Sequence, residues 1–387
     1  MSKTVYFDNN ATTRVAPEVR EAMMPFFGEL YGNPSSMHAF GGQVAAHVTK
    51  AREQVAAFLN CEPDEVLFTS CATESDNTAL RGTADWYGKD LKVVTTAVEH
   101  PAVLQPARRL KAQGHETVEL PVDGVGQIDL ERLRAELKGA KRALVSVMWA
   151  NNETGNIHPI LELAQMAKAK GALFHTDAVQ ATGKLPIRLN GSNIDFLSIS
   201  GHKLHAPKGI GVLYRQKGVP FVPFMKGGHQ EKGLRAGTEN VASIVGLGAA
   251  ARLAMRTMNE ENTRVRQMRD RLEAAILADA PDAFVNGDIP NRLPNTTNIA
   301  FKYVEGEAIL LRMYGAAGIC ASSGSACSSG SLEASHVLRA MHVDYQALHG
   351  SIRFSLSHFN TDQEIDTIIA TVPKIIRDLR AISPFGK

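Results

Sequence analysis

The chain has 387 residues, of which 44% are hydrophobic and 21% are charged, and its formal net charge is +2. This length allows a sizeable core and about two domains, and the near-neutral charge gives no electrostatic reason to expect binding to nucleic acid or to an anionic membrane. No stretch of about 18 apolar residues appears, so we expect no membrane span. The opening residues, "MSKTVYFDNNATT", lack the charged start and apolar run of a signal peptide, which predicts a cytoplasmic protein.

Helix-like and strand-like patterns alternate from about residue 40 to residue 215. Apolar residues at helical spacing predict helices over 43–59, 73–88 and 102–114. Short apolar, β-branched runs predict strands at 65–69 and 92–100 and at the start of four further segments: 142–155, 172–180, 194–203 and 209–215. This alternation predicts an α/β fold with a mainly parallel sheet.

The pattern changes after a long helix predicted over 239–278. Beyond it, the short strands "TNIAF" and "SIRFSLS" alternate with helices such as "TDQEIDTIIATVPKIIRDLR". We therefore expect a domain boundary near residue 257. The Ser- and Gly-rich stretch at about 321–333 is typical of a loop.

Polar side chains follow four of the predicted strands at the point where each apolar run ends. The clusters are Glu99-His100, Asn151-Asn152-Glu153, Asp177 with Gln180, and Gly201-His202-Lys203. Polar residues often end a strand, so one cluster alone carries little information. In an open parallel sheet, however, ligands bind beyond the carboxyl ends of the strands, and four clusters in one sheet predict a common site.

Lys203 and Asp177 suggest what that site binds. Lys203 follows a buried strand and is flanked by glycines, which suits either a solvated loop lysine or an amine that forms a Schiff base with an aldehyde. A carboxylate at the end of a buried strand, such as Asp177, is costly unless it is paired. The protonated ring nitrogen of pyridoxal phosphate (PLP) would be such a partner, so the two residues together predict a PLP site.

The segment "TSCATESDN" (69–77) predicts a phosphate cradle. It combines a strand, a turn of small residues and a helix start, so the backbone N–H groups of Ala72 and Thr73 would face an anion. The alternative is a simple helix cap at Thr73. Ser200 and His202 could add further hydrogen bonds to the phosphate.

The cysteines and histidines show no metal-binding spacing. Cys61, Cys71, Cys320 and Cys327 form no C-x-x-C pair, so neither a zinc site nor a disulfide framework is expected. His202 and His205 form H-x-x-H without a third ligand nearby in the sequence, so we predict no metal. Cys327 lies in "SSGSACSSGS", where little can bury it, and is either an incidental surface thiol or a reactive one.

The motifs along the chain resemble, in content and order, those of the PLP-dependent cysteine desulfurases. They span residues 7–357 and are "FDNNATT", "GNPSS", "TESDN", "EHPAV", "NNETG", "HTDAVQ", "SGHKLHAPKG", "RAGTEN", "SSGSAC" and "IRFSLS". The chain is most similar to the NifS-type branch of the NifS/IscS group. The resemblance implies a fold-type I PLP-dependent transferase fold, in which a large domain with a mainly parallel seven-stranded sheet (15–257) accompanies a smaller α+β C-terminal domain (1–14 and 258–387).

The resemblance also implies a reaction and its partners. A homodimer would convert L-cysteine to L-alanine and leave the sulfur as a persulfide on Cys327, the implied nucleophile. The sulfur would pass to an iron–sulfur scaffold protein of NifU or IscU type, for iron–sulfur cluster assembly that serves nitrogenase maturation. General iron–sulfur assembly stays open as the destination, and no role is assigned to Cys61, Cys71 or Cys320.

Each predicted site residue receives a role from the same resemblance. Lys203 would hold the cofactor, Asp177 would pair with its ring nitrogen, and His100 would stack on the ring and help to transfer protons. The other implied contacts are Gln180 with the phenolate oxygen, Asn152 with cofactor and substrate, Ala72, Thr73, Ser200 and His202 with the phosphate, Thr238 with the phosphate of the partner subunit, and Arg353 with the substrate carboxylate.

Two alternative functions stay open. One is another PLP enzyme on the same fold, such as a selenocysteine lyase or an aminotransferase, although an aminotransferase needs no thiol like Cys327. The other is a non-catalytic dimeric binding or scaffold protein on the same fold. The joint presence of five residues argues against it: Lys203, Asp177, His100, Arg353 and Cys327. A protein that holds PLP is yellow, so colour distinguishes the scaffold from the enzymes.

Overall fold

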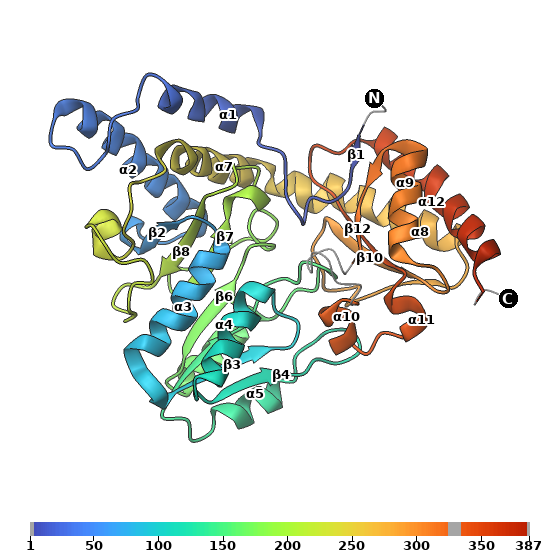
Figure 1. The fold of residues 1–387 in the computed structure, drawn as a ribbon, viewed down its shortest axis with the longest axis horizontal. Helices are drawn as coiled ribbons and strands as arrows, with labels where there is room; N and C mark the ends of the chain where they lie inside the picture. Colours follow the sequence, from blue (N-terminus) through green and yellow to red (C-terminus); the bar gives the residue numbers. More distant parts are fainter. Residues whose placement is uncertain (1–3, 324–333, 385–387) are drawn as a thin grey trace.

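The structure is a computed structural model that describes residues 4–323 and 334–384 (Figure 1). A large part is built on a seven-stranded sheet and a smaller part on a four-stranded sheet, and one long helix joins them (Figure 1). Cys327 lies outside the described residues, so its predicted place in a catalytic loop stays a prediction.

The large sheet is mainly parallel, as the sequence predicts. In pairing order its strands are β2 (Val66–Thr69), β8 (Gly211–Arg215), β7 (Phe196–Ser200), β6 (Leu173–Asp177), β5 (Arg142–Ser146), β3 (Leu91–Thr96) and β4 (Thr117–Leu120). The pairs from β7 to β4 are all parallel, whereas β8 is antiparallel to both of its neighbours.

Both faces of this sheet are covered by helices. Successive side chains of a strand point to opposite faces, so Val93 of β3 packs under α3 (Ala72–Tyr87) and α4 (Pro101–Ala112) while Val94 joins the cluster on the other face. That second face is covered by α1 (Pro17–Met23), α2 (Ala39–Leu59), α5 (Leu130–Leu137), α6 (Ile160–Ala169) and α7 (Val241–Glu260). Because both faces are buried, the strands are continuous apolar runs rather than alternating ones.

The smaller part is an antiparallel sheet with helices packed against it. Its strands, in pairing order, are β12 (Ser322–Ser323), β13 (Ser351–Ser355), β10 (Thr296–Phe301) and β9 (Ala283–Val285). Helices α8 (Arg266–Asp279), α9 (Gly306–Ala317) and α12 (Asp362–Ile382) form its core, and α11 (Tyr345–Leu348) contacts β10, whereas α10 (His336–Ala340) packs into the core of the large part. The N-terminal strand β1 (Val5–Tyr6) pairs with β11 (Ile319–Cys320), so the start of the chain lies in this part.

Short 3₁₀ turns complete the fold. They are η1 (Met24–Phe27), η2 (Pro63–Glu65), η3 (Gly88–Asp90), η4 (Gly201–Lys203) and η5 (Gln230–Gly233). The turn η4 follows β7 directly, so Lys203 lies one turn beyond the carboxyl end of a central strand.

The long helix consists of α7, a π-helical turn η6 (Glu261–Val265) and α8. Among the described residues it is the one helix that length and apolar composition would allow to cross a membrane, but 56% of its most apolar stretch is buried inside the protein, as in a core helix. The predicted boundary near residue 257 falls within it. The division into domains at 15–257, and at 1–14 with 258–387, stays a prediction.

Candidate active site

The four polar clusters predicted at strand ends border one cavity of about 340 Å³. Their strands are β3, β5, β6 and β7, which are neighbours in the sheet and parallel, so their carboxyl ends meet at one edge. Ten of the predicted site residues line the cavity: Ala72, Thr73, His100, Asn152, Asp177, Gln180, Ser200, His202, Lys203 and Arg353.

The Lys203 amine is held at the cavity wall by the N-terminal segment of the chain. Its Nζ donates to the carbonyl oxygen of Ala11 at 2.6 Å and to that of Asn10. Asn10 also reaches the neighbouring groups, because its carbonyl accepts from Gln180 Nε2 at 3.0 Å and its side chain donates to the carbonyl of Asn152 at 3.2 Å. Asn10 therefore joins three of the predicted site residues.

Asp177 is a buried carboxylate at the cavity floor. It is the last residue of β6, and its Oδ1 accepts a hydrogen bond from the backbone N–H of Val179 at 2.9 Å. Burial, followed by the charge of Asp76, raises the pKa of Asp177 to about 7. A protonated ring nitrogen beside Asp177 would offset this cost, which fits the predicted PLP ring.

A polar network lies beneath Asp177. His175, two residues earlier on β6, has Nδ1 at 2.8 Å from Ser146 Oγ and Nε2 at 3.1 Å from Ser198 Oγ. The same Nε2 lies 3.4 Å from Asp76 Oδ1, and burial lowers the pKa of His175 to about 4 while raising that of Asp76 to about 7. Sequence reasoning missed Asp76, which lines the cavity from α3.

His100 is a neutral imidazole with its proton on Nε2. It precedes the first residue of α4, and its Nδ1 accepts a hydrogen bond from the backbone N–H of Ala102 at 3.1 Å. Burial, followed by the charge of Lys203, lowers the pKa of His100 to about 4. Near pH 7 the ring can therefore lie against a cofactor and exchange a proton at Nε2.

The start of α3 offers backbone N–H groups to an anion. The helix begins at Ala72, and the capping position is Cys71, in an extended conformation and with no side-chain hydrogen bond to the helix end among the described residues. The alternative of a simple cap at Thr73 is therefore wrong. Gly211 permits this geometry, because a Cβ there would lie 2.7 Å from the Cys71 carbonyl carbon.

Two further predicted residues flank this cradle. Ser200 ends β7 and is the residue before η4. His202 Nδ1 lies 3.1 Å from Thr12 Oγ1, and burial lowers the pKa of His202 to about 4, with the charge of Lys203 as a further cause. Both residues border the same cavity as Ala72 and Thr73.

Arg353 lies buried at the opposite wall, on β13 of the smaller part. Its Nη1 donates to the carbonyl of Asn152 at 2.8 Å and its Nη2 to Asp8 Oδ1 at 2.7 Å. Its Nε is buried without a hydrogen-bond partner among the described residues, as is Gln180 Oε1. Buried polar atoms without partners suit a bound ligand. Arg353 Nε could donate to a carboxylate, and Gln180 Oε1 could accept from a hydrogen-bond donor.

Asp8 and Asn10 are site residues that sequence reasoning did not assign. Both belong to "FDNNATT", a segment that carried part of the family resemblance but received no role. The segment reaches the cavity through long-range pairing, since Asp8 forms a bridge with Ser355, the last residue of β13. The clustering of polar residues within "FDNNATT" was the available signal.

One predicted residue, Thr238, is not brought to this cavity, and Cys327 lies outside the described residues. Thr238 lines a separate cavity of about 180 Å³ together with Ser70 and Arg235. Its predicted role at the partner's phosphate stays a prediction. For Cys327, the described flanks are informative: Ser322 pairs with Arg353 in the ladder, and Ser335 donates to the Glu153 carboxylate.

Comparison with known proteins gives consistent matches over the whole chain. The profile of the class-V aminotransferase family matches residues 5–368. A cysteine desulfurase of Trichormus azollae is 56% identical over 381 residues, which cover 98% of this chain and 95% of that one. The cysteine desulfurase NifS of Azotobacter vinelandii is 57% identical over 382 residues, with 98% and 94% covered. A solved NifS-like protein superposes with a TM-score of 0.91 at 39% identity and covers 97% of this chain and 100% of its own.

Proposed function

The chain belongs to the class-V aminotransferase family and groups with its cysteine desulfurases, and from this premise we propose that it is a PLP-dependent cysteine desulfurase of NifS type. The observation that carries the proposal is the cavity at the edge of the large sheet. An amine, a buried carboxylate, a neutral imidazole and an arginine converge there from separate elements: Lys203, Asp177, His100 and Arg353.

The residues of the cavity fit PLP and divide into those that hold it and those that act on the substrate. Lys203 Nζ is the amine that would hold the cofactor aldehyde, and the start of α3 with Ser200 and His202 would hold its phosphate. When bound, PLP supplies an electron sink for the bond changes at the substrate Cα. The buried Asp177 carboxylate is placed to keep the ring nitrogen protonated.

Arg353, Lys203 and His100 would bind the substrate and transfer protons. The planar guanidinium of Arg353 can bind the carboxylate of cysteine through two hydrogen bonds. That carboxylate would share with Asp8 the hydrogen bonds of Arg353, whose Nη2 donates to Asp8. The Lys203 amine would remove the proton from Cα, and His100 Nε2 lies in the same cavity for a second transfer. The carbonyls of Asn10 and Ala11 hold the amine in place.

Cys327 is proposed as the sulfur acceptor. Its thiolate would attack the sulfur of cysteine, so that the C–S bond of the substrate breaks and a persulfide forms on Cys327. The electron pair of that bond would stay with the substrate Cβ, which takes up a proton to give the methyl group of alanine. The described flank supports this role: Ser322 lies opposite Arg353, and Cys327 is the fourth residue after Ser323, so the two can be at most about 14 Å apart.

The wider setting is also part of the proposal. We propose a homodimer that passes persulfide sulfur to an iron–sulfur scaffold protein of NifU or IscU type, in the service of nitrogenase maturation. The 57% identity to the cysteine desulfurase NifS of Azotobacter vinelandii supports this destination. A cytoplasmic location is supported by the thiols, since Cys61, Cys71 and Cys320 are all free and a persulfide carrier works in a reducing compartment.

The first test follows both products of the reaction. The purified protein should be yellow, and with L-cysteine it should form alanine while the peptide that contains Cys327 gains the mass of one sulfur atom. Lys203→Ala should abolish alanine formation. Lys208→Ala, which changes an exposed lysine of the same loop, should keep it.

Cys327→Ala separates cofactor binding from sulfur transfer. The variant should stay yellow, because none of the residues proposed to hold PLP includes position 327, but it should neither carry the extra sulfur nor turn over cysteine. A colourless protein that PLP does not restore would favour the scaffold alternative. Sulfur found on Cys61, Cys71 or Cys320 would contradict the assignment of Cys327.

A further inference from the structure

A buried carboxyl group that the proposed mechanism does not use lies at the active-site cavity. Asp76 is on α3, its side chain is fully buried, and it borders the same cavity as Asp177. Neither of its carboxyl oxygens has a hydrogen-bond partner in the part of the chain that the structure describes. A buried carboxyl group without donors is costly, so a bound group that brings a positive charge would relieve it.

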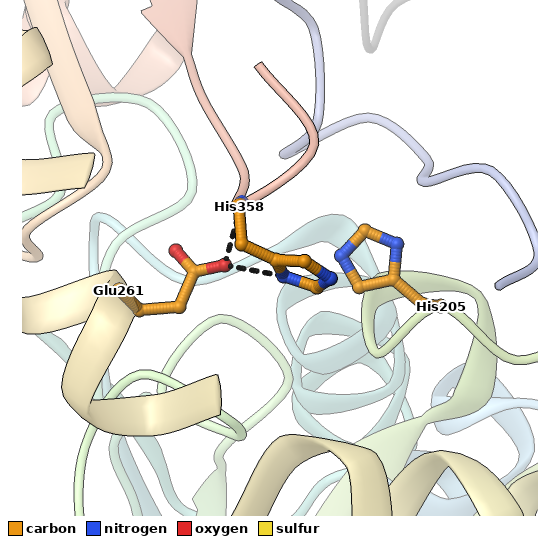
Figure 2. A group of neighbouring side chains, drawn as sticks. All are labelled: His205, Glu261 and His358. Carbon is orange, nitrogen blue, oxygen red and sulfur yellow. Dashed lines mark hydrogen bonds and ion pairs between the residues drawn. The ribbon is translucent and has the colours of Figure 1, made fainter. Parts of the chain in front are cut away.

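Another buried carboxyl group shows how the chain satisfies such a residue by itself. At the joint between the two parts, Glu261 Oε1 accepts from the Nδ1 of His358 at 3.1 Å and from its backbone N–H at 3.0 Å, and the His358 ring packs against that of His205 (Figure 2). Lys184 borders the same small cavity, and the charge of Glu261 opposes the lowering of its pKa by burial. The His205–Glu261–His358 cluster therefore has its own donors, whereas Asp76 has none among the described residues.

Asp76 faces the strand that carries Asp177. Alternate residues of a strand point to the same face, so His175 and Asp177 of β6 both face α3, while Phe174 between them packs in the cluster on the other face. Asp76 Oδ1 lies 3.4 Å from His175 Nε2. His175 thus connects Asp76 to the strand that ends in Asp177.

Two serines orient His175 toward Asp76. Ser146 Oγ lies 2.8 Å from Nδ1 and can donate to it, which leaves the ring proton on Nε2, where Ser198 Oγ lies at 3.1 Å. The Nε2–H is then shared between the Ser198 hydroxyl and Asp76 Oδ1, and both of these accept. This arrangement suits an ionised Asp76.

Three buried carboxyl groups oppose one another's ionisation at this end of the sheet. Burial is the largest cause that raises the pKa values of Asp76, Glu99 and Asp177, and the charge of Asp76 adds to it for the other two. The charge of Lys203 favours the ionised form of Asp177, and the Ser198 hydroxyl favours that of Asp76. The other titratable groups that border the cavity are two imidazoles, a thiol and a guanidinium: His100, His202, Cys71 and Arg353. A cation between Asp76 and Asp177 would favour the ionised forms of both.

We propose that Asp76 is a second carboxylate of the site, which acts together with Asp177 on the protonated ring nitrogen of PLP and is positioned by His175. This inference rests on the proposed binding of PLP. Asp177 would pair with the ring N–H directly, while Asp76 would stabilise the positive charge from the side of α3. Its charge would keep the cofactor protonated to a higher pH than Asp177 alone does.

Spectroscopic titration of the PLP-loaded protein tests the proposal. Asp76→Asn keeps the size of the side chain and removes its charge, so the pH midpoint at which the absorbance of bound PLP changes should fall by about one unit. The kcat for alanine formation should fall severalfold at an unchanged KM for cysteine. Asp85→Asn, which changes an exposed carboxylate of the same helix, should match the wild type in both. An unshifted midpoint in an Asp76→Asn protein that binds PLP would overturn the proposal, and a lower unfolding temperature alone would make Asp76 a packing residue.

A measurement on the wild-type chain covers the case in which Asp76→Asn does not fold. Labelling the aspartate carboxyl groups with ¹³C separates their infrared bands from that of Glu99. At about pH 6, below the raised pKa values of Asp76 and Asp177, addition of PLP to the cofactor-free protein should remove the carboxylic acid bands of two aspartates per chain. Loss of one such band only would contradict the proposal. A wild-type protein that takes up no PLP would overturn the proposed function as well, whereas a yellow, active wild type with an unshifted Asp76→Asn variant would overturn this inference alone.

Discussion

Burial shifts the pKa values of carboxyl groups and imidazoles around the active-site cavity in the direction that favours their uncharged forms. The pKa values of Asp76, Glu153 and Asp177 are raised to about 7, while those of His100, His175 and His202 are lowered to about 4. Desolvation is the largest cause in each case. A cofactor that brings a ring cation and a phosphate would supply the charges that this environment lacks, which is why these residues suit PLP.

Asp177→Asn tests the charge of the floor carboxylate. The amide keeps an oxygen for the Val179 N–H but cannot hold a ring nitrogen protonated, so we expect a coloured protein with a roughly hundredfold lower rate of alanine formation. Asp195→Asn is the matched control. That carboxylate is also buried and accepts from the Phe174 N–H, but it does not line the cavity. A rate within a few-fold of wild type for Asp177→Asn would exclude it as the ring partner.

At the level of the elements, sequence reasoning succeeded where a rule of the fold applies. Polar residues at the ends of β3, β5, β6 and β7 had to meet because the strands are parallel neighbours, and their side chains do line one cavity. The turn before α3 had a recognisable composition, so its helix start was predicted, although the capping position is Cys71 rather than Thr73.

Sequence reasoning failed where tertiary pairing decides the neighbours. Asn10 reaches the cavity and Asp8 reaches Arg353 because β1 pairs with β11 and Asp8 bridges to Ser355, contacts between opposite ends of the chain. The His205–Glu261–His358 cluster likewise joins a loop, a helix turn and the end of a strand. No local periodicity or spacing connects such positions, so only the folded chain reveals them.

Gly211→Ala tests whether the start of α3 holds the phosphate. Three backbone atoms, two of Cys71 and one of Ile199, lie less than 3.0 Å from where the new Cβ would stand, so the Cys71 backbone must shift. We expect a loss of about 1–3 kcal/mol in the free energy of unfolding and a PLP dissociation constant raised about tenfold.

The control for this prediction is Gly315→Ala on α9. A Cβ there meets no heavy atom within 4 Å, so the variant should keep its PLP affinity and gain slightly in stability. Spectroscopic titration of cofactor-free protein with PLP measures the affinities. If Gly211→Ala and the wild type bind PLP with equal affinity, the start of α3 does not hold the phosphate.

At the scale of the whole molecule, Thr238 of a single chain lines a separate cavity and not the active-site cavity. Large apolar side chains are exposed just before α2, with Phe27 66% and Tyr31 75% accessible. Apolar surface of this kind favours contact with a partner. Both features support the proposed homodimer, in which Thr238 would serve the site of the partner subunit.

Mixed dimers test this arrangement directly. Thr238→Asp places a carboxylate where the partner's phosphate is expected and should block activity by repulsion, while Lys203→Ala should be inactive for lack of the amine. If Thr238 acts across the dimer, a hybrid of the two chains has one intact site, formed by Lys203 of one chain and Thr238 of the other. Unfolding and refolding the variants together should then restore about a quarter of the wild-type activity per chain, because random pairing makes about half of the dimers hybrids. Each variant refolded alone should stay inactive and should elute as a dimer. A dimeric mixture without recovered activity would show that Thr238 does not act across the interface.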